Sequence, residues 1–83
     1  MKPVEEIQSR GGYQHIYRFD NDFGASVINH SFSYGTELAV VKFNSKDNFD
    51  FEIKYNTPIT DDVIGYLSEV ELEDILKEIK GLK

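Results

Sequence analysis

The C-terminal segment 57–82, TPITDDVIGYLSEVELEDILKEIKGL, combines helix start signals, an apolar stripe and a stop signal. Ser68 and Glu71 have the spacing of a capping box, and Gly81 is typical of a helix end. At about 100° per residue, the apolar side chains of this helix share one sector: Leu72, Ile75, Leu76, Ile79 and Leu82. A helix with a single apolar stripe must cover an apolar surface, which the upstream segments have to supply.

A shorter helix is predicted immediately before it. Thr60 is a suitable N-cap, and Asp61 and Asp62 place negative charge where the helix dipole is positive. The apolar residues of this helix would be Val63, Tyr66 and Leu67. The segment therefore predicts one short and one longer C-terminal helix.

Four β-strands are predicted upstream of the helices. In 13–19 every second residue belongs to one face, and Ile16 is the one apolar residue on the polar side. The run 23–30 is β-like, and 37–44 contains four consecutive apolar residues, which indicates a central strand buried on both faces. In the fourth strand a core face alternates with a wet, charged face, and the core face consists of Phe49, Phe51, Ile53 and Tyr55.

The connections between these strands are only a few residues long, which favours an antiparallel meander over a parallel sheet. The predicted fold is therefore an α+β domain, residues 13–83, with a four-stranded antiparallel meander and both helices packed on one face. Residues 1–12 contain two aliphatic side chains and end in Gly11-Gly12, so they are expected to form a loosely attached arm or edge segment.

The charge balance is acidic, with fifteen Asp and Glu against nine Lys and Arg. This argues against direct nucleic-acid binding, since phosphate neutralisation needs clustered Lys and Arg, and here these residues are scattered. No apolar run approaches the roughly twenty residues of a membrane span. The sequence has no cysteine and no apolar signal core, so we expect a soluble cytoplasmic protein that does not bind membranes.

The candidate metal-binding and acid–base residues all have structural interpretations. His15 and His30 would need Asp20 or Asp22 as a third ligand, which requires the first two strands to pair closely. Asp20-Asn21-Asp22 is a turn signal that lacks the glycine and glutamate of a calcium loop. Asp61 and Asp62 belong to a helix start.

The sequence also contains no GxSxG setting for a serine nucleophile and no phosphate-binding glycine loop. We therefore expect a non-enzymatic protein without a metal or cofactor. An enzyme or metal protein that uses the two histidines is the weaker alternative.

The loop 31–35 and one flank of the longer helix are the candidate partner-binding surfaces. Phe32 and Tyr34 in this Gly- and Ser-rich loop either fold back as a plug, which is the more usual case, or contact a partner. Glu71, Asp74 and Glu78 form an acidic flank, which is either a solvated face or a docking surface.

Several strings after residue 16 share one resemblance: YRF (17–19), FGASVI (23–28), SYG (33–35), ELAV (37–40) and TPITDDVIGYL (57–67). Together they resemble small bacteriophage- and prophage-encoded proteins of unassigned function. The resemblance implies a phage origin and a non-enzymatic accessory role, and it transfers no functional residue.

The first functional hypothesis is a small phage-encoded accessory protein that acts by protein–protein interaction, modulating or inhibiting a host or defence factor. The alternative is an acidic nucleic-acid-mimicking inhibitor of a DNA-binding enzyme, whose binding would weaken steeply with salt. An exposed edge at the first or second strand would also allow a homodimer.

Overall fold

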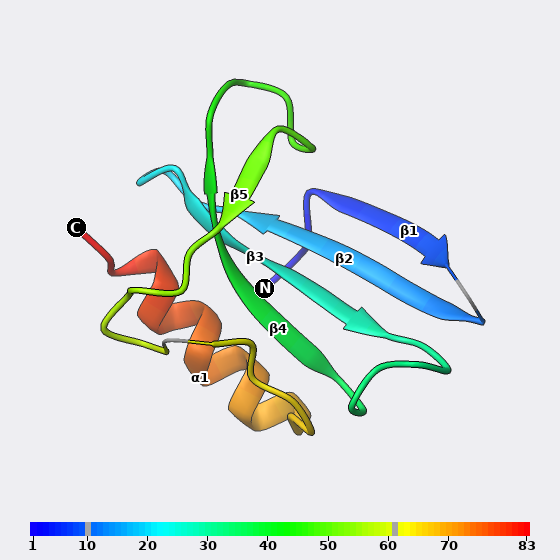
Figure 1. Cartoon of the computed structure of the whole chain (residues 1–83). Coiled ribbons are helices and arrows are strands. Elements are labelled where there is room, and N and C mark those ends of the chain that lie inside the picture. The colour runs from blue at the N-terminus through cyan, green and yellow to red at the C-terminus, as the bar shows by residue number, and fades with distance from the viewer. Residues whose placement is uncertain (10, 61) are drawn as a thin grey trace.

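The computed structural model describes residues 1–9, 11–60 and 62–83. It is an α+β fold in which an open antiparallel sheet of five strands carries one C-terminal helix (Figure 1). The elements are β1 (Glu5–Ser9), β2 (Gly12–Arg18), β3 (Phe23–Asn29), β4 (Glu37–Phe43), β5 (Phe51–Ile53) and α1 (Glu69–Lys80). The spatial order β1-β2-β3-β4-β5 equals the sequence order, which confirms the predicted meander.

The additional strand, β1, comes from the segment that we expected to be a loosely attached arm or an edge segment, and it lies at the edge of the sheet. Residues Glu5–Ser9 pair with β2, with Glu5 opposite Ile16 and Ile7 opposite Gln14. The segment was missed because EEIQS has little β propensity of its own. Its backbone hydrogen-bonds to the β2 edge, and this pairing makes the sheet one strand wider than the predicted four.

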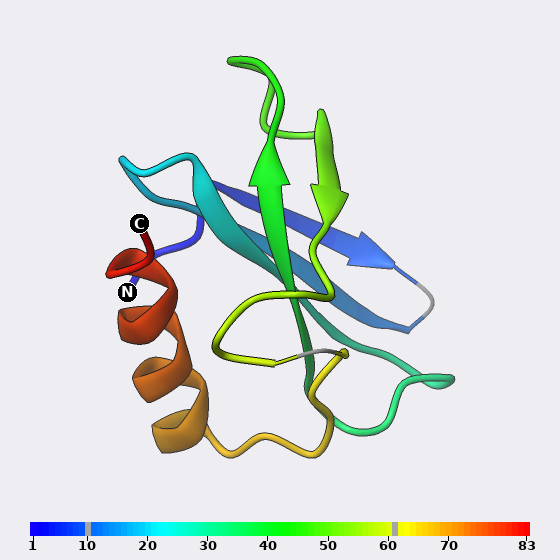
Figure 2. The ribbon, with the colours of Figure 1, turned by 60° about the vertical axis from the view of Figure 1, so that its left-hand side comes forward.

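The main core lies between the sheet and α1. Its buried residues come from four elements: Tyr17, Ala25, Val27, Leu38, Val40, Leu76 and Ile79. The helix packs on β3 and covers one face of the sheet only (Figure 2). Burial raises the pKa of the Tyr17 phenol, which is consistent with its place in this core.

The opposite face of the sheet has no helix and carries a second, smaller core. Ile16, Val41 and Phe43 are buried there, and the ring of Phe51 packs edge-on against Phe43 at a centroid distance of 5.7 Å. This explains Ile16, the apolar residue on the side of its strand that we expected to be polar. An antiparallel sheet with apolar side chains on both faces needs some cover on each.

The prediction that the four apolar residues of the last strand form its core face is wrong in part. The strand covers only Phe51–Ile53, and its apolar side chains lie on the helix-free face. Phe49 and Tyr55 fall outside the strand, and both rings are about half exposed. Alternation correctly separated the two faces of β5 but did not indicate that the helix packs on the opposite face of the sheet, against β3.

The short helix predicted over the residues after Thr60 does not form; Asp61 itself lies outside the described residues. The Thr60 hydroxyl accepts from the Asp62 N–H in a local turn instead of capping a helix. Ile64 then forms an antiparallel bridge with Leu38, with N–H to carbonyl distances of 2.8 and 2.9 Å. Pairing with the start of β4 therefore overrides the weak helix signal, which Gly65 and the β-branched residues had already reduced.

The longer helix agrees with the sequence analysis. The Ser68 side chain accepts from the Glu71 N–H and the Glu71 carboxylate accepts from the Ser68 N–H, which completes the predicted capping box. Gly81 ends the helix, with its own N–H donating to the carbonyls of Lys77 and Glu78.

Asn21, in the β2–β3 turn, also holds the C-terminal end of the helix. Its amide nitrogen lies 2.9 Å from the carbonyl oxygens of Ile79 and Leu82 and 3.2 Å from that of Lys80, while its oxygen accepts from the Phe23 N–H. A single side chain therefore satisfies carbonyls that a helix end leaves without partners.

Replacing Asn21 by alanine should lower the free energy of unfolding by about 1–3 kcal/mol, because carbonyls lose their donor. Asn21→Asp keeps the shape but places a negative charge at the negative end of the helix dipole, so it should cost at least as much. Urea unfolding followed by circular dichroism measures both. Asn56→Ala, at an exposed position, is the control. A fully stable Asn21→Asp variant would contradict the role of the amide.

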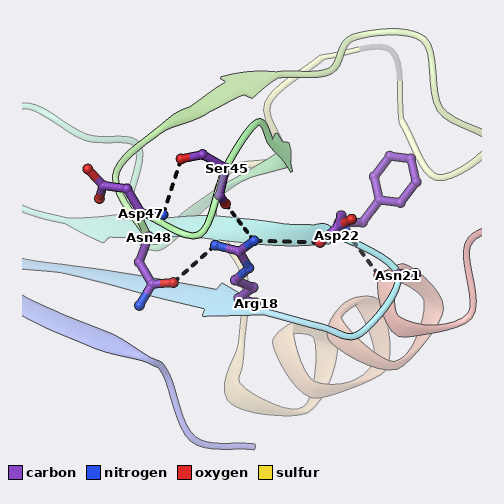
Figure 3. Close-up of polar contacts among 7 residues, drawn as sticks. Arg18, Asn21, Asp22, Ser45, Asp47 and Asn48 are labelled. Atoms are coloured by element: carbon purple, nitrogen blue, oxygen red, sulfur yellow. Dashed lines mark hydrogen bonds and ion pairs between the residues drawn. The ribbon is translucent and has the colours of Figure 1, made fainter.

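Arg18 connects the β2–β3 turn with the β4–β5 loop (Figure 3). Its guanidinium donates to the Ser45 carbonyl at 2.7 Å and to the Asn48 side chain at 3.3 Å, and it lies 3.5 Å from the Asp22 carboxylate. It also stacks over the Phe43 ring. Asn48 in turn donates to Glu5 on β1. This cluster thus closes one end of the helix-free face and has a structural role.

Candidate functional site

Three exposed aromatic rings lie at the end of the sheet where β3 turns into β4, and we call Phe32, Tyr34 and Tyr66 the aromatic end. Their exposed fractions are 80, 65 and 76 %, respectively. The rings of Tyr34 and Tyr66 lie 6.0 Å apart between centroids and are tilted by 50°. Exposed large apolar side chains are common singly, but a group of three rings is typical of a contact surface.

The backbone under Phe32 and Tyr34 is fixed by hydrogen bonds within the loop. The Ser33 hydroxyl accepts from the His30 N–H and donates to the Gly35 carbonyl at 2.7 Å. His30 Nδ1 accepts from the Phe32 N–H at 3.1 Å, and Gly35 has a φ of 60° that suits glycine. The loop is thus a built turn, and neither ring fills the core as the plug that we considered the more usual case.

Tyr66 was not among the residues proposed for partner contact, because the sequence placed it on the inner side of a helix. Its N–H donates to the Tyr34 carbonyl at 2.8 Å, and its φ of 55° is unusual for a residue other than glycine. The bridge between Leu38 and Ile64 brings the two tyrosines together. That long-range pairing left no signal in the local sequence.

The structure separates the three acids of the predicted helix flank by role. Glu71 is part of the capping box, and the hydrogen bonds from Ser68 lower the pKa of its carboxyl group. Asp74 and Glu78 are exposed further along α1. Glu71 thus caps the helix, whereas Asp74 and Glu78 are exposed acids further along the same flank.

The two histidines do not come together. His15 lies opposite Val27 in the β2–β3 register, whereas Asp20 and Asp22 belong to the turn at one end of this hairpin and His30 follows β3 at the other. His15 Nε2 is 3.8 Å from Glu6 Oε1, and its ring contacts Tyr13. Over the described ranges, no group of three His, Cys, Asp or Glu side chains could hold a metal ion.

The surface of the described residues contains several hollows, of which two lie at the helix end and on the helix-free face. One, of about 480 Å³, lies beside the end of α1 between Phe23, Pro58 and Leu82. The other, of about 280 Å³, is a groove on the helix-free face. Its lining residues come from the strands β2 to β5 and from the segment after β5: Gln14, Ser26, Ile28, Glu37, Ala39, Ile53 and Val63.

Comparison with models of protein families, with curated proteins and with solved structures finds no match to this chain. In the part of the chain that the structure describes, no helix is long and apolar enough to cross a membrane. The class of protein is therefore defined by its geometry alone: an open-faced α+β fold with three exposed aromatic rings at one end.

Proposed function

We propose that the protein is a small, non-enzymatic accessory protein that acts by binding another protein through the aromatic end. The observation that supports this proposal is the exposure of three rings on hydrogen-bonded backbone. Aromatic side chains dominate the binding energy of protein interfaces, and rigid ones lose little conformational entropy on binding. The resemblance to phage-encoded proteins makes a host or defence factor in the bacterial cytoplasm the proposed partner.

The placement of the reactive groups supports a role without catalysis. One acid of the turn and one of the helix make local contacts: Asp22 forms an ion pair with Arg18, and the Glu71 carboxylate accepts from the Ser68 N–H. The two histidines lie on different parts of the hairpin: His15 shares an open hollow with Glu6 and Tyr13, whereas His30 follows β3 at the other end. General acid–base chemistry requires such groups to converge on one reacting atom.

The aromatic end should be tested with the double variant Phe32→Ala/Tyr34→Ala. We expect recovery of the partner from a lysate of the bacterial host to fall more than tenfold, as is typical when two interface anchors are removed. Circular dichroism should be unchanged, since both side chains are exposed. Quantitative mass spectrometry of proteins retained by the tagged chain measures the recovery.

The matched control is Phe49→Ala/Tyr55→Ala, which removes two exposed rings from around β5. Its binding should equal that of the unmodified protein. Equal loss in both double variants, or loss in neither, would refute the aromatic end as the contact surface. The acidic-mimic hypothesis instead expects binding that collapses between low and high salt and is insensitive to both double variants.

A further inference from the structure

The groove on the helix-free face results from a row of small side chains across the sheet. Ser26 and Ala39 are opposite each other in the β3–β4 register. Two larger side chains flank this pair. Ile28 lies near the end of β3, and Ile53 is the last residue of β5. The chain then leaves the sheet and returns at Val63, one residue before the bridge to Leu38, which closes the remaining side of the groove.

Glu37 lies at one end of this groove. It is opposite Ile28 in the register and is only partly exposed. Across the described ranges, its carboxylate has no ion pair and no hydrogen bond. Gln14 lies on the other side of Ile28, and its amide nitrogen donates to the Ser26 hydroxyl at 3.0 Å, so its carbonyl oxygen stays available as an acceptor.

The size of the groove indicates the kind of ligand. Its volume of about 280 Å³ is below the roughly 300–1,000 Å³ of sites for drug-sized molecules, but it can take one long side chain. The apolar walls suit a methylene stem, and the carboxylate at the end suits a positive head group. Lysine and arginine combine these two properties, since their stems pack on apolar surface while the charge reaches a polar partner.

We propose that this groove binds one long cationic side chain, lysine or arginine, of the protein partner. This proposal rests on the proposed function. The groove adjoins the aromatic end, because Tyr34 and Glu37 both lie beside Gly65: a Cβ built on Gly65 would be 3.2 Å from Tyr34 Cβ and 3.8 Å from Glu37 Cγ. The groove and the aromatic end can therefore act as one continuous contact surface. The partner should therefore carry a lysine or arginine next to the part of its surface that contacts Tyr34 and Tyr66. A basic partner segment is also complementary to the net charge of −6 of this chain.

The test uses three small probes and the whole chain: the Nα-acetyl N-methylamides of lysine, arginine and the uncharged, linear norleucine. Methyl chemical shifts report binding at Ile28, Ala39, Ile53 and Val63. The methyl groups of Leu76 and Ile79, on the buried side of α1, are internal references. We expect the lysine or the arginine probe to shift the four groove methyls at concentrations of about 10 mM, where a millimolar dissociation constant gives near saturation.

Glu37→Gln should weaken binding of the charged probe about threefold, as expected for one partly exposed ion pair, and should not change the binding of norleucine. Glu52→Gln makes the same charge change on the other face of the sheet and should have no effect. Norleucine binding as tight as that of the charged probes, or an unchanged affinity in Glu37→Gln, would overturn the cation assignment. Absence of any groove shift with all three probes would overturn the site.

These titrations need no partner protein, so their failure would leave the aromatic end untouched. Conversely, a partner that ignores Phe32→Ala/Tyr34→Ala would refute the proposed function even if the groove binds the lysine probe. If both the aromatic end and the groove bind the partner, Glu37→Gln should also lower partner recovery, and Glu52→Gln should not.

Discussion

Replacing Leu38 by alanine should lower the free energy of unfolding by about 3–5 kcal/mol. Leu38 is completely buried in the core between the sheet and α1. Its backbone pairs with Ile64 in both directions, so the surrounding chain cannot easily collapse into the cavity. A chain of 83 residues is expected to have a total stability of only about 4–12 kcal/mol, so this one substitution removes much of it.

Urea unfolding followed by far-ultraviolet circular dichroism measures this loss. The control is Val70→Ala, which removes an aliphatic side chain that is 72 % exposed on α1 and should change stability by less than about 0.5 kcal/mol. If Leu38→Ala unfolded at the same urea concentration as Val70→Ala, the core would not be where the structure places it.

Replacing Gly24 by alanine should destabilise the protein by about 3 kcal/mol, at the upper end of the cost of overpacking. An added Cβ would collide with the Tyr17 carbonyl oxygen and lie 2.7 Å from Cε2 of the Phe43 ring. The carbonyl belongs to the β2 backbone, so β2 and β3 would have to separate near Arg18. Both the pairing of this hairpin and the small core under Phe43 would be disturbed.

Amide hydrogen exchange should show faster exchange in β2 and β3 of Gly24→Ala, together with a lower urea midpoint. Gly81→Ala is the matched control, because its φ is −88° and the nearest atom to an added Cβ is 3.5 Å away. That variant should keep its stability, since alanine lowers the entropy of the unfolded chain at a compatible position. Equal effects at the two glycines would contradict the close approach at position 24.

The parts of the fold that were predicted correctly have local causes. The alternation around Tyr17 and the aliphatic run around Val40 placed two strands within one or two residues of their observed bounds. The capping box at Ser68 and the stop at Gly81 bracketed α1. In each case the side-chain pattern and the backbone hydrogen bonds act over a few residues, so the sequence contains the whole signal.

The parts that were missed depend on partners outside the segment itself. β1 becomes a strand because β2 offers a free edge, and Ile64 leaves the helical state because Leu38 offers a bridge. For the candidate site, Phe32 and Tyr34 were found as loop aromatics, whereas Tyr66 joins them only through that bridge. Glu71 was predicted both as a capping residue and as part of the acidic flank, and the structure confirms the capping role.

The amide of Asn21 joins the β2–β3 turn to carbonyls 58 to 61 positions further along the chain. Each strand of the sheet, in contrast, pairs with the strand next to it in the sequence. During synthesis the hairpins can therefore form one after another as they leave the ribosome, since each needs only the strand before it. Closure over the main core has to wait for α1, the last element. Nascent chains that stall before residue 69 should thus expose Val27, Leu38 and Val40 and be bound by chaperones.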